Sequence, residues 1–142
     1  MPDRFEQYRP GYETNWANLQ IRVVQDAHAR REAELLLHGK PRYLEVERRT
    51  GVPWWFSGLC HYRESHFDMA TYLGNGQPLN RVTTIVPIGR GPFATFEDGA
   101  VDAYTIEGFL HATNWTPARA AYRLEGFNGY GYHQFGVNSP YL

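Results

Sequence analysis

The chain has few of the residues on which disulfide-stabilised domains and nucleic-acid-binding domains depend. Cys60 is its only cysteine, so no disulfide can form within the chain, and the fold does not need an oxidising compartment. Lys40 is its only lysine and the formal net charge is −1, whereas proteins that bind nucleic acid usually carry a strong positive excess. The sequence also lacks an apolar run of about 18 residues and a charged-then-apolar signal segment. We therefore expect no nucleic-acid partner and no membrane insertion.

Aromatic residues, in contrast, are abundant. They make up 15% of the 142 residues, with 10 Tyr, 8 Phe and 4 Trp. Hydrophobic content of 42% and charged content of 20% are ordinary for a globular protein, so we expect one domain over residues 1–142. Tyrosine and tryptophan combine a flat face with a polar group, which suits stacking on carbohydrate rings. A core and surface rich in tyrosine would account for the same composition.

Apolar spacing and turn residues predict a mainly α chain of the α+β type. Residues 1–12 contain two prolines and a glycine and are expected to form an N-terminal arm. Helices are expected over residues 16–37, 41–50, 53–66, 96–111 and 116–124. The first of these rests on apolar positions at roughly helical spacing, namely Leu19, Val23, Val24, Ala27, Leu35 and Leu36. Residues 74–95 predict a long loop or small β excursion, in which residues 82–87 form a strand or an extended loop. Residues 125–142 predict a glycine- and tyrosine-rich tail.

The segment over residues 52–68, VPWWFSGLCHYRESHFD, bears the most chemical information. An apolar lead-in with Trp54 and Trp55 runs straight into a dense group of ionisable side chains. Burial disfavours the charged form of a carboxyl group and raises its pKa, so an acid shielded by such residues can hold a proton near neutral pH. We take Glu64 as the leading candidate. If residues 54–68 are helical, Glu64 and Asp68 are i,i+4 neighbours on one face, together with His61.

Three interpretations of this face remain open. Glycoside cleavage would use Glu64 as the general acid and Asp68 as a second carboxylate. A metal site would use His61, Glu64 and His66, but their spacing has one residue more than the H-x-x-E-H pattern. Simple ion pairing at a helix end is the third. Cys60 lies within the apolar run and is expected to be a small buried hydrophobic residue.

A second notable cluster, LEGFNGYGY, covers residues 124–132. Its glycines permit close approach of the backbone, and the interleaved Asn128, Tyr130 and Tyr132 could stack on and hydrogen-bond to a ring with many hydroxyl groups. A glycine-rich turn packed by its own aromatic residues is the alternative. Glu125 could also be the active carboxyl in place of Glu64. No strand precedes these glycines and no Lys-Ser/Thr follows them, so they do not form a nucleotide-binding loop.

These motifs together resemble the lysozyme-like superfamily, in particular goose-type lysozymes, soluble lytic transglycosylases and related bacterial or phage muramidases. The sequence GVPWW over residues 51–55, followed by HYRES and FD up to Asp68, is similar to the catalytic helix of that group. The sequence EGFNG over residues 125–129 resembles its tyrosine-asparagine-glycine segment. NGQPL over residues 75–79 is similar to one of its loops, although an acidic residue is expected there in place of Gln77.

The resemblance extends over roughly residues 50–142 and implies a two-lobed lysozyme-like fold. It implies a peptidoglycan glycosidase that cleaves the bond between N-acetylmuramic acid and N-acetylglucosamine, with Glu64 as general acid. Asp68 or Asp98 would give electrostatic help, and the substrate-binding residues would be Tyr62, Ser65, Gln77, Asn128, Tyr130 and Tyr132. With Gln77 in place of an acid, either another group activates water or the substrate's own hydroxyl completes an anhydro sugar.

Partners and location follow from the same resemblance. We expect a monomer that acts on peptidoglycan glycan strands with no cofactor and no metal. Without a signal segment, the protein would be made in the cytoplasm and reach the cell wall after release or in a phage particle. A non-catalytic glycan-binding or structural module on the same fold remains an alternative, as does a metal-dependent amidase or peptidase.

Overall fold

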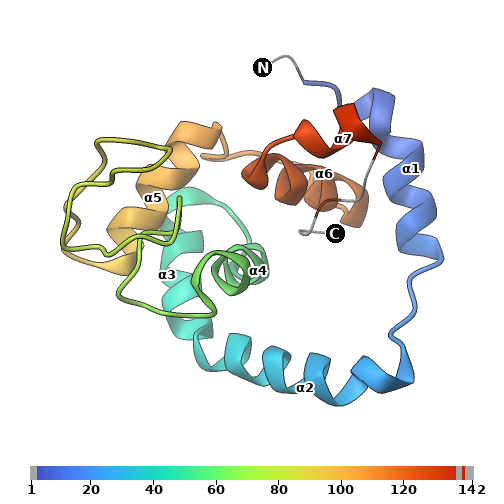
Figure 1. Ribbon diagram of the computed structural model, residues 1–142, viewed down its shortest axis with the longest axis horizontal. Coiled ribbons are helices and arrows are strands. Elements are labelled where there is room, and N and C mark those ends of the chain that lie inside the picture. The colour runs from blue at the N-terminus through green and yellow to red at the C-terminus, as the bar shows by residue number, and fades with distance from the viewer. Residues whose placement is uncertain (1–2, 137–138, 140–142) are drawn as a thin grey trace. The chain divides into compact units, whose positions relative to one another are not determined.

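The computed structural model describes residues 3–136 and residue 139, and the chain is mainly helical, as the sequence predicts (Figure 1). The helices are α1 (Phe5–Ala17), α2 (Val23–His38), α3 (Lys40–Thr50), α4 (Trp54–Ser65), α5 (Phe96–Glu107), α6 (Pro117–Asn128) and α7 (Gly131–Phe135). None of the described helices is both long enough and apolar enough to cross a membrane.

Contacts between residues divide the chain into two compact units. The first unit comprises Met1–Asp26 and Thr113–Leu142, and the second comprises Ala27–Ala112. The first unit thus joins the two ends of the chain around α1, α6 and α7. The second unit contains α3, α4, α5 and the long segment between α4 and α5.

In the first unit, α1 packs along α6. The core of this contact consists of Phe5, Tyr12, Ala118 and Tyr122, all buried. The prediction of an irregular arm over residues 1–12 is therefore wrong from Phe5 onward, while residues 1 and 2 lie outside the described part. The local sequence is polar and contains Pro10, but burial of Phe5 and Tyr12 against α6 outweighs that weak helix propensity.

The helix expected over residues 16–37 is present only in part. α1 ends at Ala17, and α2 begins at Val23. The apolar positions used for that prediction do not form a core face, because α2 has no buried residue and Val23 is 92% exposed. Leu36 is the exception to this exposure. A Cβ atom added at Gly58 would lie 2.5 Å from Leu36 Cγ, so α2 approaches α4 closely at this point.

In the second unit, α3 packs against both α4 and α5, and the sequence predicts the start of α4 well. α3 ends at Gly51, which adopts a left-handed conformation at φ 77° as expected of a helix-terminating glycine. α5 begins after Thr95, whose hydroxyl accepts a hydrogen bond from the amide of Asp98, and ends at Gly108, earlier than the predicted His111. Side chains from all three helices are fully buried in the core, among them Tyr43, Phe56, Phe96 and Tyr104.

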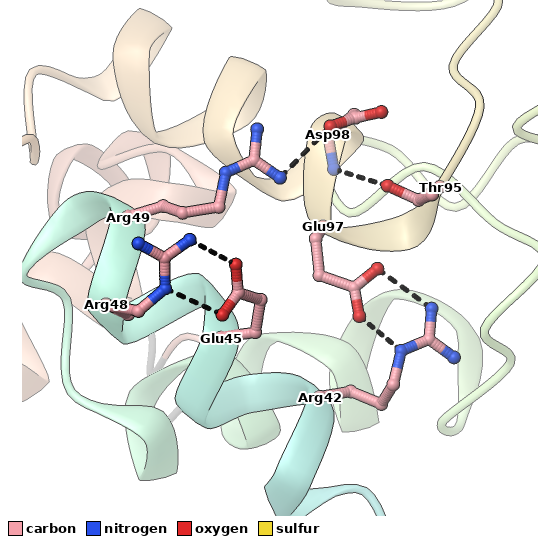
Figure 2. A network of polar contacts seen from close by, with 7 residues as sticks. All are labelled: Arg42, Glu45, Arg48, Arg49, Thr95, Glu97 and Asp98. Carbon is pink, nitrogen blue, oxygen red and sulfur yellow. Dashed lines mark hydrogen bonds and ion pairs between the residues drawn. The ribbon is translucent and has the colours of Figure 1, made fainter.

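Ion pairs join α3 to α5 along one edge of this core (Figure 2). The guanidinium of Arg42 binds both carboxylate oxygens of Glu97, with Nη2–Oε2 at 2.9 Å, and this contact lowers the pKa of Glu97. Arg49 Nη1 lies 3.0 Å from Asp98 Oδ1. Asp98, which the resemblance assigned to electrostatic help in catalysis, is thus engaged by a cation of α3.

The segment from His66 to Thr95 has no helix, as predicted for residues 74–95. Residues 82–87, for which the sequence leaves a strand or an extended loop open, form no strand. Within the described residues, regular β pairing is limited to an isolated bridge between Thr71 and Pro78. Hydrogen bonds of the buried Thr83 hold this part of the segment together. Its amide donates to the carbonyl of Arg90 at 2.9 Å, and its hydroxyl contacts the carbonyl of Pro87 and the amide of Arg90.

α6 is longer than the sequence indicates. It begins at Pro117 with Thr116 as the capping residue, as predicted, but continues to Asn128 and not to Leu124. The first residues of the expected tail are therefore helical, and α7 adds a short helix after them. Residues 137–138 and 140–142 of that tail lie outside the described residues.

Candidate functional site

Glu64 lies in the last turn of α4, half-buried. One face of α4 packs into the core of the second unit, because Phe56, Cys60 and His61 are completely buried. Trp54 and Trp55 do not shield Glu64 as the sequence suggested. They lie at the start of α4, about 14 Å away along the helix axis.

The chain reverses immediately after Glu64. α4 ends at Ser65, and the next two residues, His66 and Phe67, have φ values of 51° and 68°. Non-glycine residues in this left-handed region are uncommon and are often retained at functional sites. The supposition that the helix continues to Asp68 is therefore wrong.

Asp68 consequently does not stand one turn beyond Glu64 on a shared face. It is exposed, and its Oδ1 accepts a hydrogen bond from the amide of Ala70 at 2.9 Å. Its own amide donates to Ser65 Oγ at 3.2 Å. In this structure, Asp68 and Ser65 shape the turn that follows the candidate acid.

A glycine brings the next loop directly against the helix end. Gly76 has φ 76°, and a Cβ atom added there would lie 2.6 Å from the backbone oxygen of Glu64. Only a residue without a side chain allows so close an approach. Gly76 therefore places the loop over residues 74–79 beside the candidate acid.

The side chain of Gln77 joins this loop to the next one. Its Oε1 accepts hydrogen bonds from the amides of Thr84, at 2.8 Å, and Ile85, at 3.3 Å. Its Nε2 donates to Thr84 Oγ1 at 2.9 Å, and Asn75 Nδ2 donates to the carbonyl of Ile85 at 3.1 Å. The two amide side chains thus fix residues 84 and 85 next to the Gly76 loop.

No acidic residue occurs between Met69 and Phe96. The loops that pack against the end of α4 therefore bring no carboxylate of their own to the candidate acid. Sequence reasoning had noted only the glutamine at position 77. The whole segment lacks Asp and Glu, so a water-activating carboxylate would have to come from elsewhere in the chain.

His61 has both ring nitrogens occupied inside the core. Its Nε2 lies 2.9 Å from the carbonyl oxygen of Asp68, and its Nδ1 lies 2.7 Å from Tyr43 Oη. A carbonyl can only accept, so Nε2 carries the proton and Nδ1 accepts from the tyrosine hydroxyl. Burial lowers the pKa of this imidazole.

These contacts bear on the metal interpretation. His61 has no nitrogen left for a metal ion, and His66 Nε2 lies 2.8 Å from Glu32 Oε2 on α2. Among residues 3–136 and 139, no group of three or more His, Cys, Asp or Glu side chains is placed to hold a metal. The His61, Glu64 and His66 set is thus not gathered around a common point.

His61 leads to a prediction about acid stability. The pKa of His61 is lowered from its ordinary value of about 6.5. Just below that pH, the unfolded chain therefore binds a proton at His61 and the folded chain does not. We expect this contribution to stability to be complete above about pH 6.5 and to fall progressively as the pH drops below it. Urea unfolding at a series of pH values should give a steeper acid loss for the wild-type chain than for His61→Gln. Equal slopes would contradict the prediction.

Cys60 and Glu107 complete the surroundings of α4. Cys60 is fully buried, as predicted, and burial raises the pKa of its thiol, with a further contribution from the negative charges of Glu64 and Glu107. Glu107, the last residue of α5, keeps an exposed side chain, yet desolvation raises its pKa to about 7. Sequence reasoning missed this carboxyl, because only the packing of α5 on α4 brings it near Cys60.

The candidate site residues fall into two groups. Around the end of α4, the second unit gathers Tyr62, Glu64, Ser65, Asp68 and Gln77. Tyr62 is half-buried there, with its ring 5.7 Å from that of Phe67. The other predicted residues, Asn128, Tyr130 and Tyr132, belong to the first unit.

In the first unit, Tyr130 and Glu125 contribute to packing. Tyr130 stacks on Tyr122 with ring centroids 4.8 Å apart, and its hydroxyl donates to the Tyr122 carbonyl at 2.9 Å. Glu125 is 3% exposed, accepts a hydrogen bond from the hydroxyl of Tyr12, and lies 2.8 Å from His133 Nε2. Asn128, the last residue of α6, is exposed, and Tyr132 in α7 is half-buried.

Comparisons of the chain with protein-family models, with curated proteins and with solved structures give no match.

Proposed function

We propose that this chain is a peptidoglycan glycosidase with a two-lobed lysozyme-like fold. Glu64 is its general acid and cleaves the β-1,4 bond between N-acetylmuramic acid and N-acetylglucosamine. The observation that carries the proposal is the close approach of Gly76 to the backbone of Glu64. It places a polar loop beside a half-buried carboxyl at the end of a core helix.

The surroundings of Glu64 suit proton donation. The same helix carries His61 and Cys60 on its buried side, where burial lowers the pKa of the imidazole and raises the pKa of the thiol. Partial burial of a carboxyl group disfavours its charged form, as a general acid requires. Ser65 and the turn to Asp68 fix the backbone immediately after it.

The second half of the reaction follows from the residues that face this end of the helix. The Glu64 carboxyl donates its proton to the bridging oxygen, the bond from C1 to that oxygen breaks, and the departing sugar leaves as an alcohol. In the proposed second step, the 6-hydroxyl of the muramyl sugar attacks C1 in place of water, in keeping with loops over residues 69–96 that carry no acid. Its proton returns to Glu64, which acts as the base, and the product is an anhydro sugar.

Digestion of purified cell-wall glycan tests this proposal directly. Mass spectrometry of the products is expected to find disaccharide ends that are lighter by one water than the hydrolysed form. Reducing ends of normal mass would keep the glycosidase and overturn the anhydro step. Freed peptides with intact glycan would indicate an amidase. Binding without any cleavage would favour a non-catalytic glycan-binding module.

A further inference from the structure

A recess of about 430 Å³ lies between α1 and the start of α6, and all of its walls come from the first unit. One side is a stripe of α1 with Phe5, Arg9, Glu13 and Trp16 at helical spacing. The other side is the segment that leads into α6, from Asn114 to Ala118. Its volume is within the range of sites that hold small ligands.

Trp16 is the most unusual residue of this recess. It is 59% exposed, whereas tryptophan is highly buried on average in folded proteins. The recess also has apolar lining, because Phe5, at the other end of the α1 stripe, and Ala118 are buried. An exposed indole at the edge of a recess offers a flat face for a ring that has an apolar side.

Two side chains of opposite charge, Arg9 and Glu13, line the same recess. Arg9 lies 3.0 Å from a carboxylate oxygen of Glu6 and 3.2 Å from one of Glu13, so its guanidinium is held in place along α1. Within the lining, the charges of Arg9 and Glu13 cancel. A ligand that carries a formal charge of either sign would therefore gain little here, whereas hydroxyl and amide groups could pair with both.

Asn114 adds a fixed amide on the opposite wall. Its Oδ1 accepts from the hydroxyl of Thr116 at 2.9 Å and from the amide of Thr116 at 3.3 Å. These contacts hold the side chain through its oxygen, and its Nδ2 can donate to a ligand. The recess thus has an aromatic face, a guanidinium, a carboxylate and an amide donor.

We propose that this recess is a second saccharide-binding site, in which Trp16 stacks on a neutral sugar ring. Arg9, Glu13 and Asn114, which line the same recess, bind hydroxyl and acetamido groups along the bound saccharide. The assignment of the sugar as a β-1,4-linked N-acetylglucosamine unit rests on the proposed function. Such a site would keep the enzyme on a polymer between cleavage events.

The experiment uses the full chain with Glu64→Gln, so that the ligand survives the measurement. The N-acetylglucosamine tetramer is titrated while NMR follows the indole N–H signals of the four tryptophans. We expect the Trp16 signal to shift, and Trp16→Ala to weaken tetramer binding at this site about tenfold, while Trp16→Phe retains part of it. Leu19→Ala, an exposed apolar change outside the recess, is the matched control and should have no effect.

The outcomes separate this proposal from the proposed function. A wild-type chain that cleaves murein while its Trp16 signal stays unchanged by the tetramer overturns the saccharide site and retains the glycosidase. A chain that leaves murein intact but shows the Trp16 shift retains the site and overturns the glycosidase. A glucose tetramer that shifts Trp16 equally would overturn the part of the assignment that depends on the acetamido group.

Discussion

Replacement of Glu64 by glutamine is expected to reduce the rate of murein cleavage by about 10²–10⁴-fold, the usual contribution of a positioned general acid. Glutamine keeps nearly the same size and can make similar hydrogen bonds, but it has no proton to donate to the bridging oxygen. Since Glu64 is only half-buried, the fold should survive the change. Turbidity of a murein suspension measures the loss, and circular dichroism checks that the helices remain.

Two further carboxyl variants test whether the loss of cleavage is specific to Glu64. Glu34→Gln, an exposed change on α2, is the matched control and should cleave at the normal rate. Glu107→Gln tests the other carboxyl near Cys60. The pKa of Glu107, raised to about 7, also suits proton donation. If Glu107→Gln abolishes cleavage while Glu64→Gln retains it, Glu64 is not the acid and the mechanism proposed above is wrong.

The second large effect is expected at Gly76. Alanine there must adopt φ 76° and place its Cβ against the carbonyl oxygen of Glu64. The left-handed conformation alone costs about 1–2 kcal/mol, and relief of the collision must move the loop or the helix end by a sizeable fraction of an ångström. We therefore expect Gly76→Ala to lower the unfolding free energy by about 2–4 kcal/mol and to slow murein cleavage by about a hundredfold.

Gly89 supplies the matched control for this change. It has φ 79°, almost the same conformation, but a Cβ atom there would meet nothing within 4 Å. Gly89→Ala should therefore show the conformational cost and keep full activity. Urea unfolding and murein clearance of the two variants isolate the effect of the contact with Glu64. If both variants behaved alike in both assays, the Gly76 contact would have no role in positioning the site.

Several boundaries of the fold could be predicted because their signals are local. Gly51 ends α3 as a left-handed residue, Thr95 caps α5, and Thr116 with Pro117 opens α6, all as expected from the sequence. Each of these depends on hydrogen bonds and backbone angles within a few residues, which the chain carries wherever it folds. Burial of Cys60 was likewise evident from the apolar run around it.

Predictions that depended on more distant contacts were less successful. The supposed arm is helical from Phe5 because Phe5 and Tyr12 meet α6, more than a hundred residues away in sequence. The apolar positions Val23, Val24 and Leu35 have helical spacing in α2, but they are exposed and no core covers them. Periodicity indicates which residues share a face, yet it does not specify whether another element packs there.

For the candidate site, the sequence by itself determined which residue types are present: a glutamate after an apolar run, and loops without a carboxylate from Met69 to Phe96. Tertiary structure alone decided their arrangement. The reversal at His66 and Phe67 separates Asp68 from Glu64, Gly76 brings its loop onto the helix end, and Gln77 closes that loop. The physical reason is that backbone reversals and close approaches are set by atoms distant along the chain, whereas composition and capping are set by neighbours.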